Sequence, residues 1–494
     1  MPTNRTHEKR ERSRRWLGQP QQQQPTQAVQ PSFDSHSSLE SSSQEPAEAQ
    51  NESTAVGRHW AQVSSSWRTH HSPQYASMVV PTGNSDAPIH RWFHLKEAYS
   101  KDLLPSLLAL LPNIVTNDRS LTIVDPFSGV GTTMVSAIEQ LRSGKISRLR
   151  GYGLEVNPFL QFVTATKTSS ALNGAAPAIT TLASLVACAQ KTRVAPEELP
   201  SLSTFGNERF FPREHVEQLV ALRRAIDEAD IGDADRNWAR LALAMTVEPA
   251  SRLRRDGRTL RYEDRAPLAP YEVFVRALER IAEDVPELAL PSGDVQIRHG
   301  SALNPGWGVE PGAADLVLFS PPYPNNIDYT EVYKTELWAL GFVANQDEFR
   351  EQRQRTLRSH PSVKFRRELK YPNDARGGDV TKLIDPVIGE IPSDSRYAKS
   401  LERMIEGYAD DMLTVFDAAY KALRQGGFCV YIVGNSVHGT SEAPVMIASD
   451  VMLARLGEIA GFTVESINIA RTLPRRRIDS AFVRESLVVL RKEA

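Results

Sequence analysis

Short, unbroken apolar runs alternate along this chain with longer stretches in which apolar residues recur three and four positions apart. Runs of the first kind predict buried strands, and the longer stretches predict amphipathic helices. The runs that predict strands are Leu121–Val124, Leu149–Glu155, Val295–Arg298, Asp315–Phe319, Phe428–Val433, Phe462–Ile469 and Leu487–Leu490. Because helical patterns separate most of these runs, the sequence predicts an α/β fold.

The first strand runs into a glycine turn, Asp125–Thr133 (DPFSGVGTT). Gly129 and Gly131 allow a tight turn and a close approach of the backbone to a ligand, and Thr132 or Thr133 can cap the helix that follows. The spacing is G-x-G-T-T, without a third glycine three positions after the second and without G-K-[ST]. A dinucleotide cradle or a P-loop is therefore disfavoured, and a ligand without phosphates fits better. A purely structural turn is the alternative.

The second strand ends in an acid, Glu155, about 25 residues after the glycines of the turn. This is the distance expected for a carboxylate that binds ribose hydroxyls. Asn157 and Pro158 then break the strand and begin a helix. The order of strand, glycine turn, helix, strand and acid predicts a nucleoside-binding site.

Another strand, Asp315–Phe319, stops at Ser320-Pro321-Pro322-Tyr323. Two prolines stiffen the backbone and cannot donate to a sheet, so the strand must end there. Open α/β sheets place their chemistry at the carboxyl ends of such strands. The loop offers a hydroxyl and carbonyl oxygens, which accept hydrogen bonds from an amino group, and an aromatic ring that can stack on a flat base. An ordinary proline turn is the alternative.

Composition excludes several classes of protein. The 494 residues are 40% hydrophobic and carry a formal net charge of −2, which excludes a uniformly basic binding protein but not local basic patches. Two cysteines, far apart and without a His/Cys cluster, indicate neither a disulfide framework nor a zinc site. We therefore expect no metal. The chain has no apolar run long enough to span a membrane and no signal peptide, so we expect a cytoplasmic location.

Composition also divides the chain into segments. Residues 1–60, rich in Gln, Ser, Glu and Pro, predict a disordered arm. Residues 166–292 predict a helical insertion, with helices at Leu182–Gln190, His215–Ala229, Asn237–Val247 and Tyr271–Glu283. Residues 343–400 form a long polar segment.

Within the polar segment, Arg350–Lys370 contains eight Lys and Arg residues against two acids, a net charge of about +6. Such an asymmetry favours contact with nucleic-acid phosphates, although a solvated helix face is the common alternative. The loop Arg471–Arg477 is a second basic candidate. The residues we expect to contact nucleic acid are Arg355, Arg358, Lys364, Arg366, Arg367, Arg475 and Arg476.

Together, DPFSGVGTT, GLEVNP, SPPY and the closing ESLVVLRK resemble the amino-group DNA methyltransferases. The resemblance covers roughly residues 88–165, 295–342 and 420–492. It implies a Rossmann-like, mostly parallel seven-stranded sheet with one reversed edge strand. The core segments would be residues 88–165, 293–342 and 401–494, and residues 343–400 would recognise the target.

The resemblance also implies S-adenosyl-L-methionine as cofactor and assigns site residues. Those expected to bind the cofactor are Asp125, Pro126, Phe127, Gly129, Gly131, Thr132, Glu155, Asn157 and Ser301. Ser301 departs from the family, which often has Asp there. Those expected to act in catalysis are Ser320, Pro321, Pro322 and Tyr323, with Tyr323 stacking on a base flipped out of the duplex.

The expected activity is methylation of an exocyclic amino group in DNA, with cytosine N4 preferred over adenine N6 because Ser leads the tetrad. An RNA amino-group methyltransferase and a catalytically inactive nucleic-acid-binding domain are the alternatives. The resemblance further implies DNA as partner, with a restriction or defence-system protein as another candidate. We expect no membrane partner and either a monomer or a dimer.

Overall fold

The computed structural model describes residues 54–111, 113–174, 179–200, 204–256, 259–325, 327–393, 397–439, 443–473 and 480–493. All of them lie in one compact unit, Pro46–Ala494. Most of the arm predicted over residues 1–60 lies outside the described residues. Its last part is corrected, because α1 (Ala55–Val63) is a helix with Trp60 fully buried.

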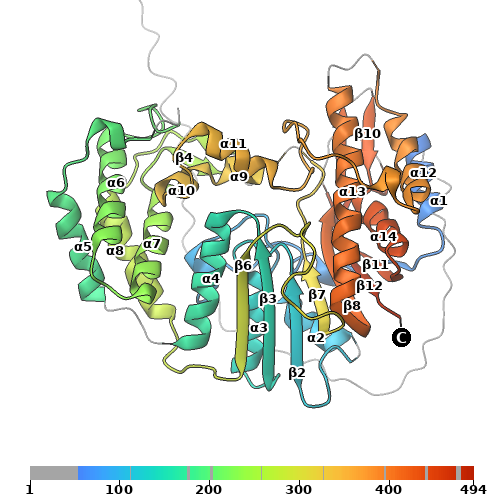
Figure 1. Cartoon of the computed structure of the whole chain (residues 1–494), viewed down its shortest axis with the longest axis horizontal. Coiled ribbons are helices and arrows are strands. Elements are labelled where there is room, and N and C mark those ends of the chain that lie inside the picture. The colour runs from blue at the N-terminus through green and yellow to red at the C-terminus, as the bar shows by residue number, and fades with distance from the viewer. Residues whose placement is uncertain are drawn as a thin grey trace, which may run out of the picture. The chain divides into compact units, whose positions relative to one another are not determined.

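The described residues form one main sheet of eight strands in the order β1-β11-β12-β8-β7-β2-β3-β6 (Figure 1). Strand β12 runs antiparallel to both of its neighbours, and every other neighbouring pair is parallel. The strands are β1 (Thr69–His71), β2 (Ser120–Asp125), β3 (Arg148–Glu155), β6 (Gly293–His299), β7 (Ala314–Phe319), β8 (Leu423–Gly434), β11 (Thr463–Thr472) and β12 (Arg484–Arg491).

The sheet confirms the predicted α/β, Rossmann-like fold and contains all seven predicted strands. Two details are corrected. An eighth strand, β1, adds to the edge beside β11, and its three exposed residues have no apolar pattern that could predict it. The reversed strand β12 lies inside the sheet, between β8 and β11, and not at its edge.

The pleat of the strands divides the core into two layers, one on each face of the sheet. In β7, Leu316 and Leu318 pack into one hydrophobic cluster, whereas Val317 and Phe319 pack into the other. The first cluster includes side chains of α2 (Leu103–Leu110), α3 (Thr132–Arg142) and α4 (Pro158–Asn173). The second includes those of α1, α12 (Gly377–Ile388), α13 (Ala398–Ala422) and α14 (Ser449–Ile459).

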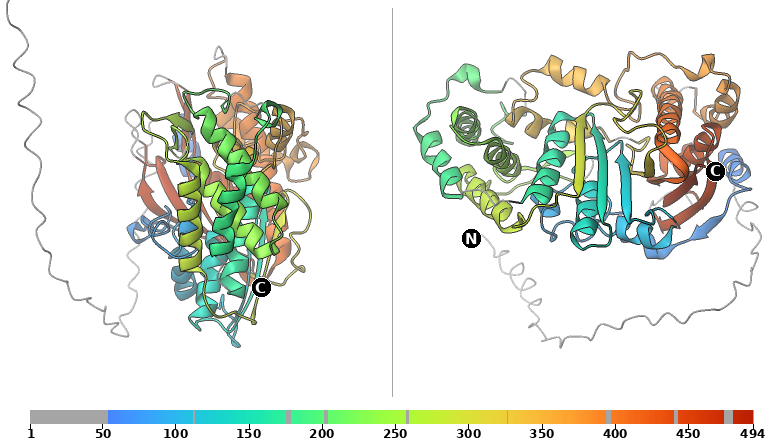
Figure 2. Two further views of the ribbon diagram at one scale, coloured as in Figure 1. Left: turned by 90° about the vertical axis from the view of Figure 1, so that its left-hand side faces the viewer. Right: turned by 60° about the horizontal axis from the view of Figure 1, so that its bottom comes forward.

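The helical insertion lies at the β6 end of the sheet, away from α13 and α14 (Figures 1 and 2). All four predicted helices are present, as α5 (Ile179–Lys191), α6 (Arg213–Glu228), α7 (Asp233–Val247) and α8 (Pro270–Asp284). A short hairpin, β4 (Leu253–Arg255) with β5 (Leu260–Tyr262), follows α7. The insertion shares the first hydrophobic cluster with α3 and α4, so it is packed onto the core.

The polar segment carries little regular structure. It contains α11 (Gln346–Gln354) and α12, and it follows the short helices α9 (Tyr329–Val332) and α10 (Lys334–Ala339). The remaining short elements are η1 (Pro73–Tyr75), η2 (His90–Trp92), η3 (Pro196–Glu198), η4 (Tyr371–Asn373), β9 (Ser436–Gly439) and β10 (Pro444–Ile447). No helix in the described part of the chain is both long and apolar enough to cross a membrane.

Candidate functional site

A cavity lies where the carboxyl ends of β2, β3, β6 and β7 meet, at the edge of the sheet where parallel strands deliver their loops. It encloses about 980 Å³, counting the part that opens to solvent. The residues predicted for the site that line it are Pro126, Phe127, Gly129, Glu155, Asn157, Ser301, Ser320, Pro321, Pro322 and Arg355. The cavity therefore unites the glycine turn, the acid after β3 and the proline loop.

The glycine turn and the acid are joined directly. The Gly129 N–H donates to Oε2 of Glu155 (2.9 Å), and the Asn157 N–H donates to Oε1 of the same carboxylate (2.9 Å). Burial raises the pKa of Glu155 to about 7. Gly129 has φ of +50°, which glycine adopts without strain. The turn therefore holds the carboxylate in one position at the cavity wall.

Three residues predicted to bind the cofactor do not line the cavity. The Asp125 carboxylate accepts hydrogen bonds from the Phe127 N–H (3.0 Å) and from the Thr133 hydroxyl. It therefore stabilises the glycine turn without lining the cavity. Gly131 has φ of +86°, and a Cβ there would come within 3.0 Å of Thr164 on α4. Gly131 thus lets α3 pack closely on α4. It is also the N-cap of α3, so neither Thr132 nor Thr133 caps this helix, contrary to the sequence expectation, and both are buried within its first turn.

The chemistry of the cavity wall fits a nucleoside with free hydroxyls. A carboxylate has about four lone-pair sites, and Glu155 uses two of them for backbone N–H groups. Asn157 caps α4 through its oxygen, which accepts the N–H groups of Phe159 and Leu160, while its buried Nδ2 has no partner among the described residues. A buried, unpartnered donor beside a carboxylate is what a ligand with both acceptors and hydroxyls requires. The residues therefore fit the adenosine part of S-adenosylmethionine.

The proline loop is divided between the cavity and the sheet behind it. Ser320, Pro321 and Pro322 line the cavity. Tyr323 does not: its ring packs against Gly434, where a Cβ would come within 3.0 Å of it, and its hydroxyl donates to Glu485 Oε1 (3.1 Å). In this structure the Tyr323 ring is therefore not placed to stack on a ligand in the cavity, contrary to the sequence expectation.

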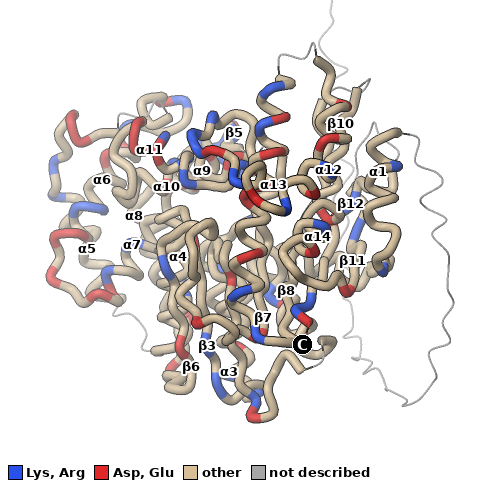
Figure 3. Tube along the Cα trace, turned by 45° about the vertical axis from the view of Figure 1, so that its right-hand side comes forward, with Lys and Arg blue, Asp and Glu red and all other residues tan. Residues whose placement is uncertain are grey.

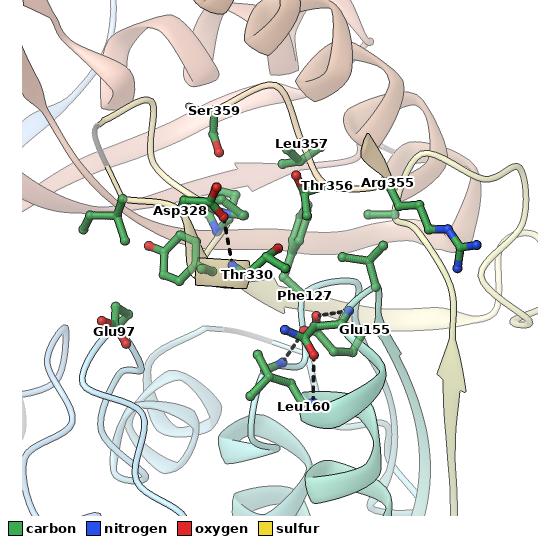
Figure 4. Close-up of a pocket in the computed structure, with 18 of the residues that line it drawn as sticks. Glu97, Phe127, Glu155, Leu160, Asp328, Thr330, Arg355, Thr356, Leu357 and Ser359 are labelled. Atoms are coloured by element: carbon green, nitrogen blue, oxygen red, sulfur yellow. Dashed lines mark hydrogen bonds between the residues drawn. The ribbon is translucent and has the colours of Figure 1, made fainter. Parts of the chain in front are cut away.

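Several cavity residues were not among those predicted. Among them are Glu97, Asp328 and Thr330, which Figure 4 shows around the same cavity as Glu155. The Glu97 Oε2 accepts a long hydrogen bond from Tyr333 (3.4 Å), and its buried Oε1 has no partner in the described part of the chain. Burial raises the pKa of Glu97 to about 7. The sequence signal that could have identified Glu97 is an acidic residue within the aromatic-rich stretch of residues 89–100 (IHRWFHLKEAYS).

The polar segment also reaches the cavity. Thr356, Leu357, Ser359 and His360 line it together with Val363. Arg355 lines the cavity beside them and is one of the basic residues by which the segment was noticed, but the rest of this wall carries no such charge. The segment therefore supplies a wall of the cavity, a role that counting its charges could not reveal.

Arg358 requires a correction. It is 5% exposed, and its guanidinium contacts Asp411 Oδ1 (2.6 Å) and Asp410, both on α13. A charge that is buried and paired in this way is not available to a phosphate. Arg358 instead anchors the cavity-lining segment to α13.

Most of the other charges in Arg350–Lys370 are also paired. Arg350, Arg353, Arg366 and Arg367 contact Asp347, Asp328, Glu351 and Asp411 respectively. Figure 3 shows acidic positions interspersed with basic ones around α9 and α11. Among the described residues, the exposed side chains of Arg355, Lys364 and Lys370 have no hydrogen-bond or ion-pair partner. Arg475 and Arg476 lie outside the described residues.

No metal site was expected, and none of the described residues forms a group of three or more His, Cys, Asp and Glu side chains that could hold an ion.

Comparison with known proteins relates the chain to methyltransferases. The Type II methyltransferase M.BsoBI of Geobacillus stearothermophilus is 23% identical over 441 residues, which cover 78% of this chain and 81% of that protein. The Type II methyltransferase M.AvaI of a Nostoc strain is 24% identical over 430 residues, covering 81% and 85%. These relatives confirm the resemblance to methyltransferases.

Two other comparisons add nothing to this relationship. No family model matches the chain. Among solved structures, the rRNA methyltransferase AviRa of Streptomyces viridochromogenes covers 89% of this chain and 96% of its own, at 11% identity and a TM-score of 0.22. A TM-score this low supports no inference about fold or function.

Proposed function

We propose that this protein is an S-adenosylmethionine-dependent DNA methyltransferase that modifies an exocyclic amino group, with cytosine N4 preferred over adenine N6. One observation carries the proposal: the glycine turn, the acid Glu155 and the loop Ser320–Pro322 line a single cavity. The similarity to two Type II methyltransferases over about four fifths of the chain supports it. The preference for cytosine rests only on Ser at the first position of the tetrad.

The side of the cavity formed by β2 and β3 would hold the cofactor. Glu155 has lone pairs free for the two ribose hydroxyls, and the Asn157 Nδ2 can donate to an acceptor of the nucleoside. When bound, S-adenosylmethionine would supply a sulfonium methyl group for the amine nitrogen. The carbon–sulfur bond would break to leave the neutral thioether, and the methylated nitrogen would lose one proton to solvent. A Cβ at Gly129 would come within 3.3 Å of Leu95, another residue that lines the cavity, so a longer side chain there would crowd this side of the site.

The side formed by β7 would hold the target amine. Such a nitrogen is a poor nucleophile because its lone pair is conjugated with the ring. Ser320 Oγ and the carbonyl of Pro321 can accept its two hydrogens, which fixes the nitrogen and frees the lone pair. The gain comes from positioning and from electrostatic stabilisation, and it needs no covalent intermediate. A base held inside this cavity must first leave the duplex.

The test compares DNA from a bacterial host that expresses the protein with DNA from a host that expresses Ser320→Ala. After enzymatic digestion, mass spectrometry measures N4-methylcytosine and N6-methyladenine. We expect one modified base, N4-methylcytosine, with the wild type, and a loss of at least 100-fold with the variant, since an acceptor that positions the amine is removed. Binding of radiolabelled S-adenosylmethionine should survive Ser320→Ala and be lost in Gly129→Asp.

Other outcomes decide between the alternatives. Cofactor binding without a modified base in DNA, together with methyl transfer to cellular RNA, would replace the proposal by an RNA methyltransferase. Absence of cofactor binding by the folded wild type would leave only a nucleic-acid-binding role. N6-methyladenine in place of N4-methylcytosine would keep the enzyme class and reverse the preferred base.

A further inference from the structure

A chain of hydrogen bonds leads from the cavity wall into the sheet. Ser320 Oγ donates to Tyr323 (3.3 Å) or to the Ile432 carbonyl (3.2 Å). Tyr323 donates to Glu485 Oε1 (3.1 Å), and Arg471 Nε donates to the other oxygen, Oε2 (2.6 Å). Glu485 is the second residue of β12 and lies 162 positions after Tyr323 in the sequence, so these hydrogen bonds join the proline loop to a distant strand.

The chemistry of the two ends fixes the direction of every bond in this chain. An ionised carboxylate can only accept, so the Tyr323 hydrogen must point to Glu485. The Tyr323 oxygen can then only accept from Ser320, and the Ile432 carbonyl can also only accept from it. Ser320 therefore gives its single hydrogen to the protein in either arrangement. Its lone pairs remain for the cavity.

We propose that Glu485 is a positioning residue that keeps Ser320 an acceptor toward the cavity, so that the site selects a ligand with an N–H group. The inference rests on the proposed function, because Ser320 has a catalytic role only if the ligand is an amine. Glu485 itself does not line the cavity and acts through Tyr323.

Neighbouring residues hold Tyr323 and Glu485 in the positions that these hydrogen bonds require. Glu485 pairs with Gly434 across β12 and β8, and Tyr323 packs against this glycine because no side chain stands there. Glu485 is 6% exposed, and the Arg471 guanidinium compensates its buried charge. Burial and the charge of Glu485 both raise the pKa of Tyr323, so its hydroxyl keeps its proton.

An isosteric substitution of Glu485 reverses the direction of the hydrogen bond between Tyr323 and Ser320. In Glu485→Gln the amide oxygen must face Arg471 Nε, which can only donate, so the amide NH₂ faces Tyr323. Tyr323 then accepts from the amide and points its own hydrogen at Ser320. This hydrogen bond occupies one lone pair of Ser320 Oγ. The cavity therefore has one hydrogen-bond acceptor site fewer, although its volume is unchanged. In Tyr323→Phe the substitution of Glu485 cannot affect Ser320 in this way, because the hydroxyl that connects the two residues is absent.

The experiment is a double-mutant cycle on the full-length protein. The wild type, Glu485→Gln, Tyr323→Phe and the double variant transfer labelled methyl from S-adenosylmethionine to unmethylated plasmid DNA under single-turnover conditions. We expect Glu485→Gln to lower the rate at least tenfold in the wild-type background and less than twofold in the Tyr323→Phe background. Cofactor binding should change less than twofold throughout.

The matched control is Glu465→Gln, which removes another ion pair between β11 and β12, that of Glu465 with Arg491, and should change the rate less than twofold. Equal losses for Glu485→Gln in both backgrounds would mean that Glu485 acts only on stability, and no loss in the wild-type background would mean that it does not act at all. Either result overturns the inference. If the wild type transfers no methyl group, the proposed function fails instead.

Discussion

At the scale of single residues, the cavity combines two carboxylates in different situations. Glu155 is held by two backbone N–H groups, whereas one oxygen of Glu97 is buried without a partner among the described residues. Folding thus places at Glu97 a group that it does not satisfy. Such a cost is common at sites that bind ligands, where the partner arrives with the ligand.

The burial of Glu97 predicts an unusual dependence of stability on pH. Its pKa is raised from 4.5 to about 7, so between these values the folded protein keeps a proton that the unfolded chain has released. The stability of the unliganded protein therefore falls as pH rises through this window. Glu97→Gln removes the effect, and its Tm should exceed that of the wild type by a margin that grows from pH 5 to pH 8, corresponding to roughly 1–3 kcal/mol.

Thermal unfolding monitored by circular dichroism at several pH values measures this margin. Glu310→Gln is the control, because Glu310 is exposed and its substitution should leave the pH profile parallel to that of the wild type. If Glu97→Gln also runs parallel to the wild type, Glu97 is not the buried carboxylate that the structure describes.

At the scale of elements, the local sequence predicted the features that depend on local sequence alone, namely the apolar strands and the glycine turn. Residues 316–319 of β7 form an unbroken apolar run because both faces of the strand are covered. The glycine turn was visible because its backbone needs Gly129 and Gly131. Partners from distant segments could not be predicted in this way. The acids that neutralise the basic polar segment lie partly on α13, and Glu485 meets Tyr323 only because β12 pairs with β8.

The anchor of the polar segment to α13 predicts a strong effect on stability. Arg358→Met keeps most of the apolar volume and removes the charge, which leaves Asp410 and Asp411 buried with too few partners. We expect a loss of about 3–5 kcal/mol in the free energy of unfolding, measured by urea denaturation. Trypsin should also cleave faster after Arg355 and Lys364, because the segment loses its attachment.

The comparison is Arg350→Met, which breaks the exposed pair with Asp347 and should cost at most about 1 kcal/mol. Equal losses for the two variants would show that the contacts of Arg358 with α13 contribute no more than a surface pair.

At the scale of the whole molecule, the near-neutral net charge of −2 means that any attraction to DNA must come from local groups. Within Arg350–Lys370, five of the eight basic side chains are engaged by acids. The exposed Arg355, Lys364 and Lys370 have no partner in the described part of the chain, so they are the ones free to displace counterions from phosphates. Of these three residues, Arg355 also lines the cavity, which places its guanidinium beside the proposed target base.

This reasoning predicts how salt affects DNA binding. Each phosphate contact contributes about 0.9 to the slope of log K against log salt concentration. Replacing Arg355, Lys364 and Lys370 by Ala should therefore lower the slope by up to about 2.7, measured by fluorescence anisotropy with a labelled duplex. The double control Arg350→Ala and Arg366→Ala removes exposed arginines that are already paired, and it should lower the slope by less than about 0.5, since pairing with Asp347 and Glu351 leaves little charge for DNA. Equal changes per removed charge in both sets would mean that these ion pairs open on binding and that the whole segment contacts the phosphates.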